Sequence, residues 1–124
     1  MNREEVAQGC LDQAAWAVKL GSPMYEALLQ RMAEDVRAEG PCLAALGREM
    51  PVSRMQAPLL LLAAIHRMVL DGQLPEAARF YPSTGGHADV DALWPHWLAA
   101  VPQAVKRRSD GSRWNPAPTR PRCI

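Results

Sequence analysis

Residues 57–72 read Ala57-Pro-Leu-Leu-Leu-Leu-Ala-Ala-Ile-His-Arg-Met-Val-Leu-Asp-Gly72, and this stretch decides the fold. Leucine and alanine are good helix formers, Pro58 suits the first turn of a helix, and Gly72 suits the residue just past its end. The run Leu59–Ile65 has no polar side chain, which is typical of a helix buried in a core. It is far shorter than the roughly 20 apolar residues that cross a membrane. We therefore expect a central buried helix over about residues 58–71, with Leu59–Ile65 in the core.

The remaining apolar segments also predict helices. Four prolines each stand at the head of such a segment, as is common in the first turn of a helix: Pro23, Pro41, Pro58 and Pro75. The fold class that we expect is all-α, a small bundle of five or six helices around the central one. Residues 3–20 form the first of these, and the second follows after two residues. Such a short joint favours antiparallel neighbours or a steep crossing.

The charge of the 124 residues is unevenly distributed, although the formal net charge is only +1. Residues 106–124 carry six basic side chains against Asp110, contain several prolines and lack apolar periodicity. We therefore expect a helical domain over residues 1–105 and a basic, Pro-rich disordered tail over residues 106–124. A small interaction or nucleic-acid-binding protein that uses this tail is the alternative function. Six cations spread over the tail favour a solvated end, so we do not expect nucleic acid as a partner.

Three cysteines, Cys10, Cys42 and Cys123, form no Cys-x-x-Cys pair, and their number is odd. Reduced thiols are therefore expected. The charged N-terminus is not followed by an apolar segment, so we expect neither a signal peptide nor a membrane span. These features predict a cytoplasmic protein.

Residues able to carry chemistry are few and scattered. His66, His87 and His96 do not have the spacing of metal ligands, either among themselves or with the cysteines. The turn at residues 83–86 lacks the lysine of a phosphate-binding loop. No nucleophile, base and orienting acid can be paired from their spacing. We expect no catalytic residue, no cofactor and no metal, and hence no enzymatic activity of this chain.

Three blocks of sequence resemble a bacterial family when they are taken together. They are Leu20–Leu29, Pro58–Gly72 with Ala77–Pro82, and Asp91–Pro95. Their order resembles the N-terminal part of the proteins grouped as domain-of-unknown-function family 2332, over about residues 6–100. Longer members of that family have a methyltransferase-like later half with a Gly-Ala-Ser-Ala-Gly segment, which this sequence lacks. The resemblance thus implies a truncated chain, a non-catalytic helical module or fragment of a methyltransferase-like protein. A shifted reading frame would account for the tail.

The resemblance also implies a surface that faces the missing domain. The residues that we expect on this surface are His66, Arg67, Tyr81, Gly85 and Gly86. A domain face without its partner exposes apolar side chains, so we expect self-association through an exposed apolar face. The sequence identifies no other partner.

Overall fold

The computed structural model describes residues 2–46 and 56–109, and this part of the chain is helical and contains no strand. The prediction of an all-α fold with five or six helices is confirmed. Along the chain the elements are α1 (Arg3–Lys19), α2 (Pro23–Arg37), α3 (Pro41–Ala44), α4 (Ala57–Leu70), α5 (Pro75–Ala78), the 3-10 helix η2 (Pro82–Thr84) and α6 (Val90–Ser109). Within the described ranges no helix combines the length and the apolar character that crossing a membrane requires.

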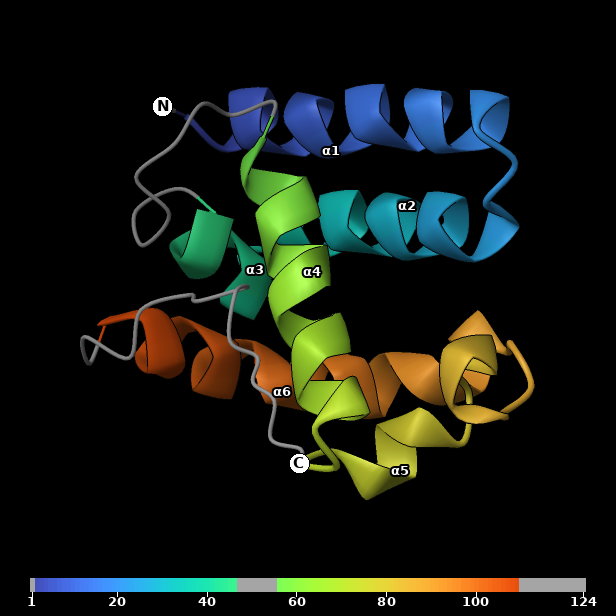
Figure 1. Ribbon diagram of the computed structural model, residues 1–124. Coiled ribbons are helices and arrows are strands. Elements are labelled where there is room, and N and C mark those ends of the chain that lie inside the picture. Colours follow the sequence, from blue (N-terminus) through green and yellow to red (C-terminus); the bar gives the residue numbers. More distant parts are fainter. Residues whose placement is uncertain (1, 47–55, 110–124) are drawn as a thin grey trace.

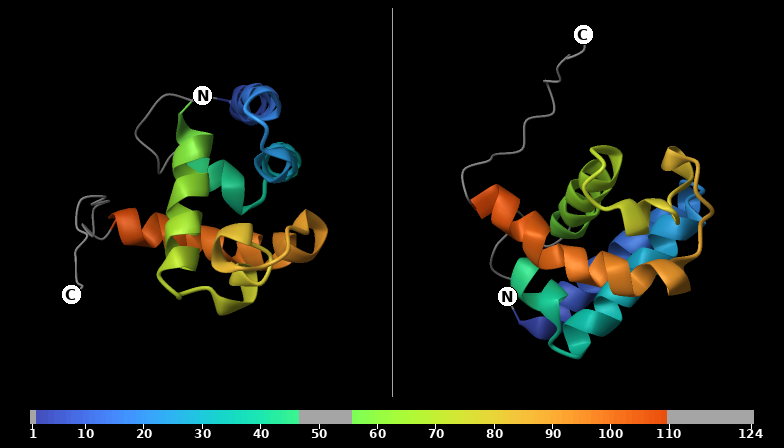
Figure 2. Two further views of the ribbon diagram at one scale, coloured as in Figure 1. Left: turned by 45° about the vertical axis from the view of Figure 1, so that its right-hand side comes forward. Right: turned by 90° about the horizontal axis from the view of Figure 1, so that it is seen from below.

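Helices α1 and α2 form an antiparallel pair along one side of the molecule (Figures 1 and 2), which is one of the two arrangements expected. Asn2 and Glu5 form a capping box at the start of α1, in which each side chain binds the backbone N–H of the other. The Ser22 hydroxyl accepts a hydrogen bond from the Tyr25 backbone N–H at the start of α2. Gly21 between the helices has φ +78°, a left-handed conformation that suits glycine.

Helix α4 crosses the other helices at the centre of the fold (Figure 1), as the sequence predicts. Its burial is one-sided. Its inner face contributes seven residues to the core: Ala57, Pro58, Leu61, Leu62, Ile65, Met68 and Val69. Leu59 is 42% exposed and Ala63 is also exposed, so the expectation that all of Leu59–Ile65 is core is wrong at these two positions. The reason is that the packing helices lie on the inner side of α4.

Helix α6 packs against α4, α2, α3 and α5 and completes the core. The Asp89 side chain accepts a hydrogen bond from the Ala92 backbone N–H and so caps its first turn. The helix runs through Pro95 and Pro102, whereas a proline is expected in the first turn or at a kink. It continues to Ser109, beyond the boundary expected at residue 105. The rest of the expected tail, residues 110–124, lies outside the described residues.

Candidate functional site

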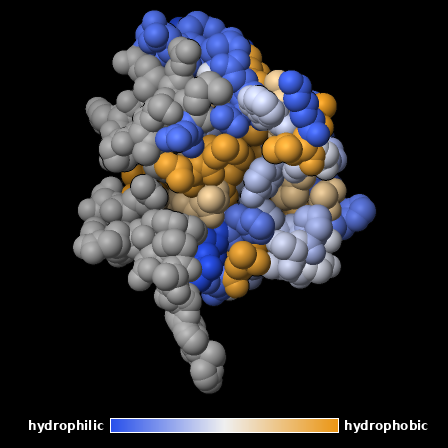
Figure 3. Space-filling view, turned by 45° about the horizontal axis from the view of Figure 1, so that its top comes forward, coloured by the Kyte–Doolittle hydropathy of each residue, from blue (hydrophilic) through white to orange (hydrophobic). Residues whose placement is uncertain are grey.

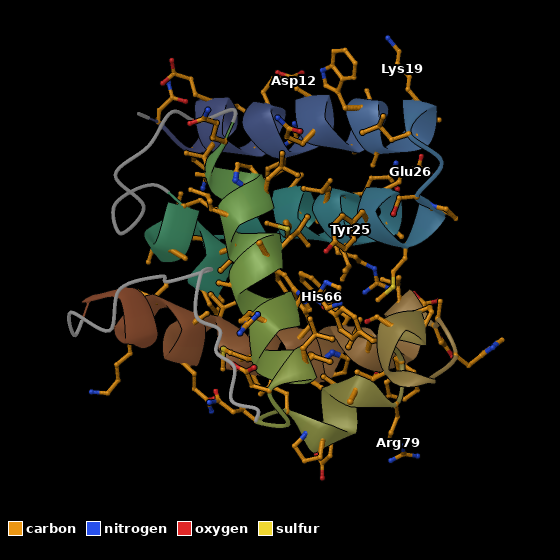
Figure 4. The ribbon with its side chains drawn as sticks, viewed as in Figure 1. Asp12, Lys19, Tyr25, Glu26, His66 and Arg79 are labelled. Atoms are coloured by element: carbon orange, nitrogen blue, oxygen red, sulfur yellow. The ribbon has the colours of Figure 1, made fainter. Side chains whose placement is uncertain are left out.

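His66 lies at the border between the buried and the exposed face of α4 and connects three separate segments of the chain. Its Nδ1 atom lies 3.3 Å from the hydroxyl oxygen of Tyr25 on α2, and its Nε2 atom lies 2.8 Å from the Ser83 hydroxyl oxygen on η2. The imidazole also stacks on the ring of Tyr81, with 5.0 Å between the ring centroids and 25° between the planes. Figure 4 shows Tyr25 and His66 between α2 and the lower half of α4. We call Tyr25, His66, Tyr81 and Ser83 the His66 cluster.

The turn that carries Tyr81 and Ser83 is held in place by two glycines. Gly85 has φ +82°, which suits glycine, and it ends η2. Gly86 donates its N–H to the Tyr81 carbonyl oxygen, 2.9 Å away. It also packs against the α5 backbone, where an added Cβ would lie 2.7 Å from the Ala78 carbonyl oxygen and closer still to that of Arg79. Both glycines therefore shape the turn beside His66.

Two buried polar groups lie where the cluster meets the core, one on Tyr81 and one on Trp97. Tyr81 is 2% exposed and Trp97 on α6 is fully buried. The Tyr81 hydroxyl and the Trp97 indole N–H lack a hydrogen-bond partner within the described part of the chain. Burial raises the pKa of Tyr81 above its ordinary value, and the nearby Tyr25 adds to the increase. Tyr81 is thus a neutral and well-anchored platform for the His66 ring.

The His66 cluster is uncharged near pH 7. Burial lowers the pKa of His66 below its ordinary value, because the cationic form loses more hydration than the neutral form. Burial raises the pKa of Tyr25, so its phenol keeps its proton. The hydrogen bonds of the cluster are therefore bonds between neutral groups.

Arg67 is separated from the His66 cluster, although it is the next residue in the sequence. Its side chain points to the outer face of α4 and forms an ion pair with Asp71 one turn later, with 3.4 Å between Nε and Oδ1. The structure thus brings His66, Tyr81 and the turn at Gly85–Gly86 together and places Arg67 elsewhere. That these residues face another domain stays a prediction.

Reasoning from sequence missed three residues of this region: Tyr25, Ser83 and Trp97. Tyr25 sits three residues before Leu28 on the apolar stripe of α2, so its hydroxyl was a signal of a polar contact at the edge of the core. Ser83 directly follows the Tyr81-Pro82 pair that the family resemblance includes. Neither position indicates His66 as a partner before the helices are packed.

The described residues contain no group of three or more His, Cys, Asp or Glu side chains that could hold a metal ion. The Asp89 carboxylate serves as the cap of α6. The basic residues of the alternative nucleic-acid function lie at the end of α6 and in residues 110–124, which the structure does not describe.

Comparison with protein-family models identifies a family for this chain. The model of a family described as "Uncharacterized protein conserved in bacteria (DUF2332)" matches residues 7–111. No curated protein and no solved structure matches the chain.

Proposed function

The chain belongs to the DUF2332 family of bacterial proteins, and from this premise we propose that it is a non-catalytic helical module that docks on a partner domain. The partner is a methyltransferase-like domain of the kind that the sequence resemblance implies for longer members of the family. The proposal rests on one observation above all, the apolar outer face of α4.

That outer face is a stripe of four residues spaced three or four positions apart, which we call the α4 stripe: Leu59, Ala63, Arg67 and Leu70. Leu59 is 42% exposed and Leu70 is 51% exposed. Figure 3 shows apolar side chains gathered near the centre of this side of the molecule. Exposed apolar patches with a polar rim mark sites of protein association. Arg67 adds a cation that is already held in position by Asp71.

The His66 cluster supports the same reading from beside the stripe. Its neutral hydrogen bonds tie α2, α4 and η2 together and so hold α4 in a fixed position. A rigid helix face needs little reordering when a partner binds, which favours association. In this proposal the role of the His66 cluster is to hold α4, the docking helix, in position.

Mixing experiments test the proposal. The purified chain is titrated into the methyltransferase-like domain of a longer family member, and heat is measured by calorimetry. We expect binding that Leu59→Lys weakens at least about tenfold, because it places a charge in an apolar contact. Val18→Lys is the matched control, since Val18 is 54% exposed on α1, away from the stripe. Equal binding by both variants would refute the assignment to α4.

Two further measurements separate the competing functions. Sedimentation of the chain alone reports self-association, and a dimer that Leu59→Lys dissociates would make a second copy the occupant of the stripe. Calorimetry with S-adenosylmethionine reports a binding site for that cofactor. Binding of the cofactor by this chain alone would contradict a non-catalytic module.

A further inference from the structure

Ser83 and His66 have the geometry of a nucleophile and its base. The Ser83 hydroxyl oxygen lies 2.8 Å from His66 Nε2, within the range in which a proton passes between them. Ser83 is exposed, so a reagent from solution reaches its oxygen. A serine is a weak nucleophile by itself and becomes effective when an adjacent base removes its proton.

The neighbours of His66 also orient its imidazole toward Ser83. When Nδ1 carries the proton, it donates to the Tyr25 hydroxyl oxygen 3.3 Å away, and the lone pair of Nε2 faces Ser83. Stacking on the buried Tyr81 ring fixes the plane of the imidazole. Burial lowers the pKa of His66 below its ordinary value and so favours the neutral imidazole, which is the state that accepts a proton.

The neighbouring hydroxyl provides a contrast within the same turn. Thr84 Oγ1 donates to the carbonyl oxygens of Ala78 and Tyr81, at 2.8 Å and 3.0 Å. A backbone carbonyl accepts a hydrogen bond but does not take up the proton at neutral pH. The two adjacent hydroxyls of η2 thus have different partners, and only the partner of Ser83 is a base.

We propose that Ser83 is a nucleophilic serine that accepts an acyl group from an activated donor such as a thioester, with His66 as its general base. The Ser83 oxygen attacks the acyl carbon, and its proton passes to His66 Nε2. The carbon–sulfur bond then breaks, and the leaving thiolate takes this proton from His66. The products are an ester on Ser83 and a free thiol. This proposal does not rest on docking through the α4 stripe.

The test uses p-nitrophenyl acetate as the acyl donor and the full chain. After brief exposure near pH 7.5, the protein is digested and each acetyl group is located by tandem mass spectrometry. We expect acetylation of Ser83 with Thr84 unmodified, and at least about 100-fold slower acetylation of Ser83 in His66→Gln, which is the range that a general base contributes. Circular dichroism verifies that the variant is folded.

Unfolding the wild-type chain in urea gives a second measurement that does not depend on any variant. The rate of Ser83 acetylation should then fall to that of Thr84, because α4 with His66 and η2 with Ser83 separate when the chain unfolds. Equal acetylation of Ser83 and Thr84 in the folded chain would overturn the proposal. So would a Ser83 rate that is unchanged in folded His66→Gln or in urea.

Discussion

Asp35 caps a helix to which it does not belong. Its Oδ2 atom accepts a hydrogen bond of 2.9 Å from the backbone N–H of Cys42, near the start of α3. Gly40 makes this possible, because a Cβ at that position would collide with the Asp35 carboxylate. One side chain in the last turn of α2 thus fixes the direction in which the chain continues.

Replacing this cap should destabilise the protein. We expect Asp35→Ala to lower the free energy of unfolding by about 1 kcal/mol, the usual effect of removing a capping side chain. Glu34→Ala is the matched control, since Glu34 is exposed on the same turn, and we expect it to change stability by less than about 0.5 kcal/mol. Urea denaturation followed by circular dichroism measures both. Equal losses in the two variants would argue against the cap.

The turn beside His66 depends on the missing side chain of Gly86. Gly86→Ala places a Cβ against the rigid backbone of residues 78–79, so we expect a loss of about 2 kcal/mol or more in unfolding free energy. Gly85→Asn is the control, because nothing lies within 4 Å of an added Cβ there and asparagine tolerates positive φ. Thermal unfolding compares the two variants. A Gly86→Ala protein as stable as the control would show that the turn adapts.

The helices could be predicted from sequence because their signals are local. A proline or a capping side chain marks each start, as at Pro23 and Asp89, and apolar spacing marks the inner face. The outer face of α4 could not be predicted, because Leu59 and Leu61 have the same side chain and differ only in which way the helix turns them. That orientation is set by packing against distant segments.

The His66 cluster was beyond prediction for a similar reason. Tyr25 and His66 are 41 positions apart, and their contact depends on the angle between α2 and α4. No spacing rule covers such a pair. The family resemblance still singled out His66 and Tyr81, which the structure stacks together, whereas it also included Arg67, which points away.

Because the pKa of His66 is lowered in the folded state, we expect the protein to become less stable as the pH decreases. The unfolded chain titrates this imidazole near pH 6.5, and burial lowers its pKa in the folded state. The unfolded state therefore binds more protons as the pH falls, so this contribution is complete above about pH 6.5 and is lost below it. We expect unfolding free energy to decrease from pH 7 to pH 5.5, and to decrease less in His66→Gln. Parallel slopes in urea titrations of the two proteins would contradict this origin.

Cys10 and Cys42 should be unreactive in the folded protein. Burial raises the pKa of Cys10 to about 12, and burial together with Asp35 raises that of Cys42 further. The reactive thiolate is therefore scarce at pH 8. In a Cys123→Ser background, we expect iodoacetamide to modify neither thiol until urea unfolds the chain, as measured by intact mass. Rapid modification under native conditions would show that α1 or α3 opens locally and exposes its cysteine.

Glu39 holds a backbone conformation that suits glycine better. Its φ is +61°, although Gly40 follows directly, and its carboxylate forms an exposed ion pair with Arg3. Left-handed backbone at a residue with a Cβ costs about 1 kcal/mol. We expect Glu39→Gly to be more stable than Glu39→Ala by about that amount, because both variants lose the ion pair and only glycine relieves the strain. Denaturation midpoints in urea compare the two. Exposed ion pairs contribute less than about 1 kcal/mol. Glu39→Gly should therefore be at least as stable as the wild type. A clear loss of stability would mean that the ion pair with Arg3 outweighs the backbone strain.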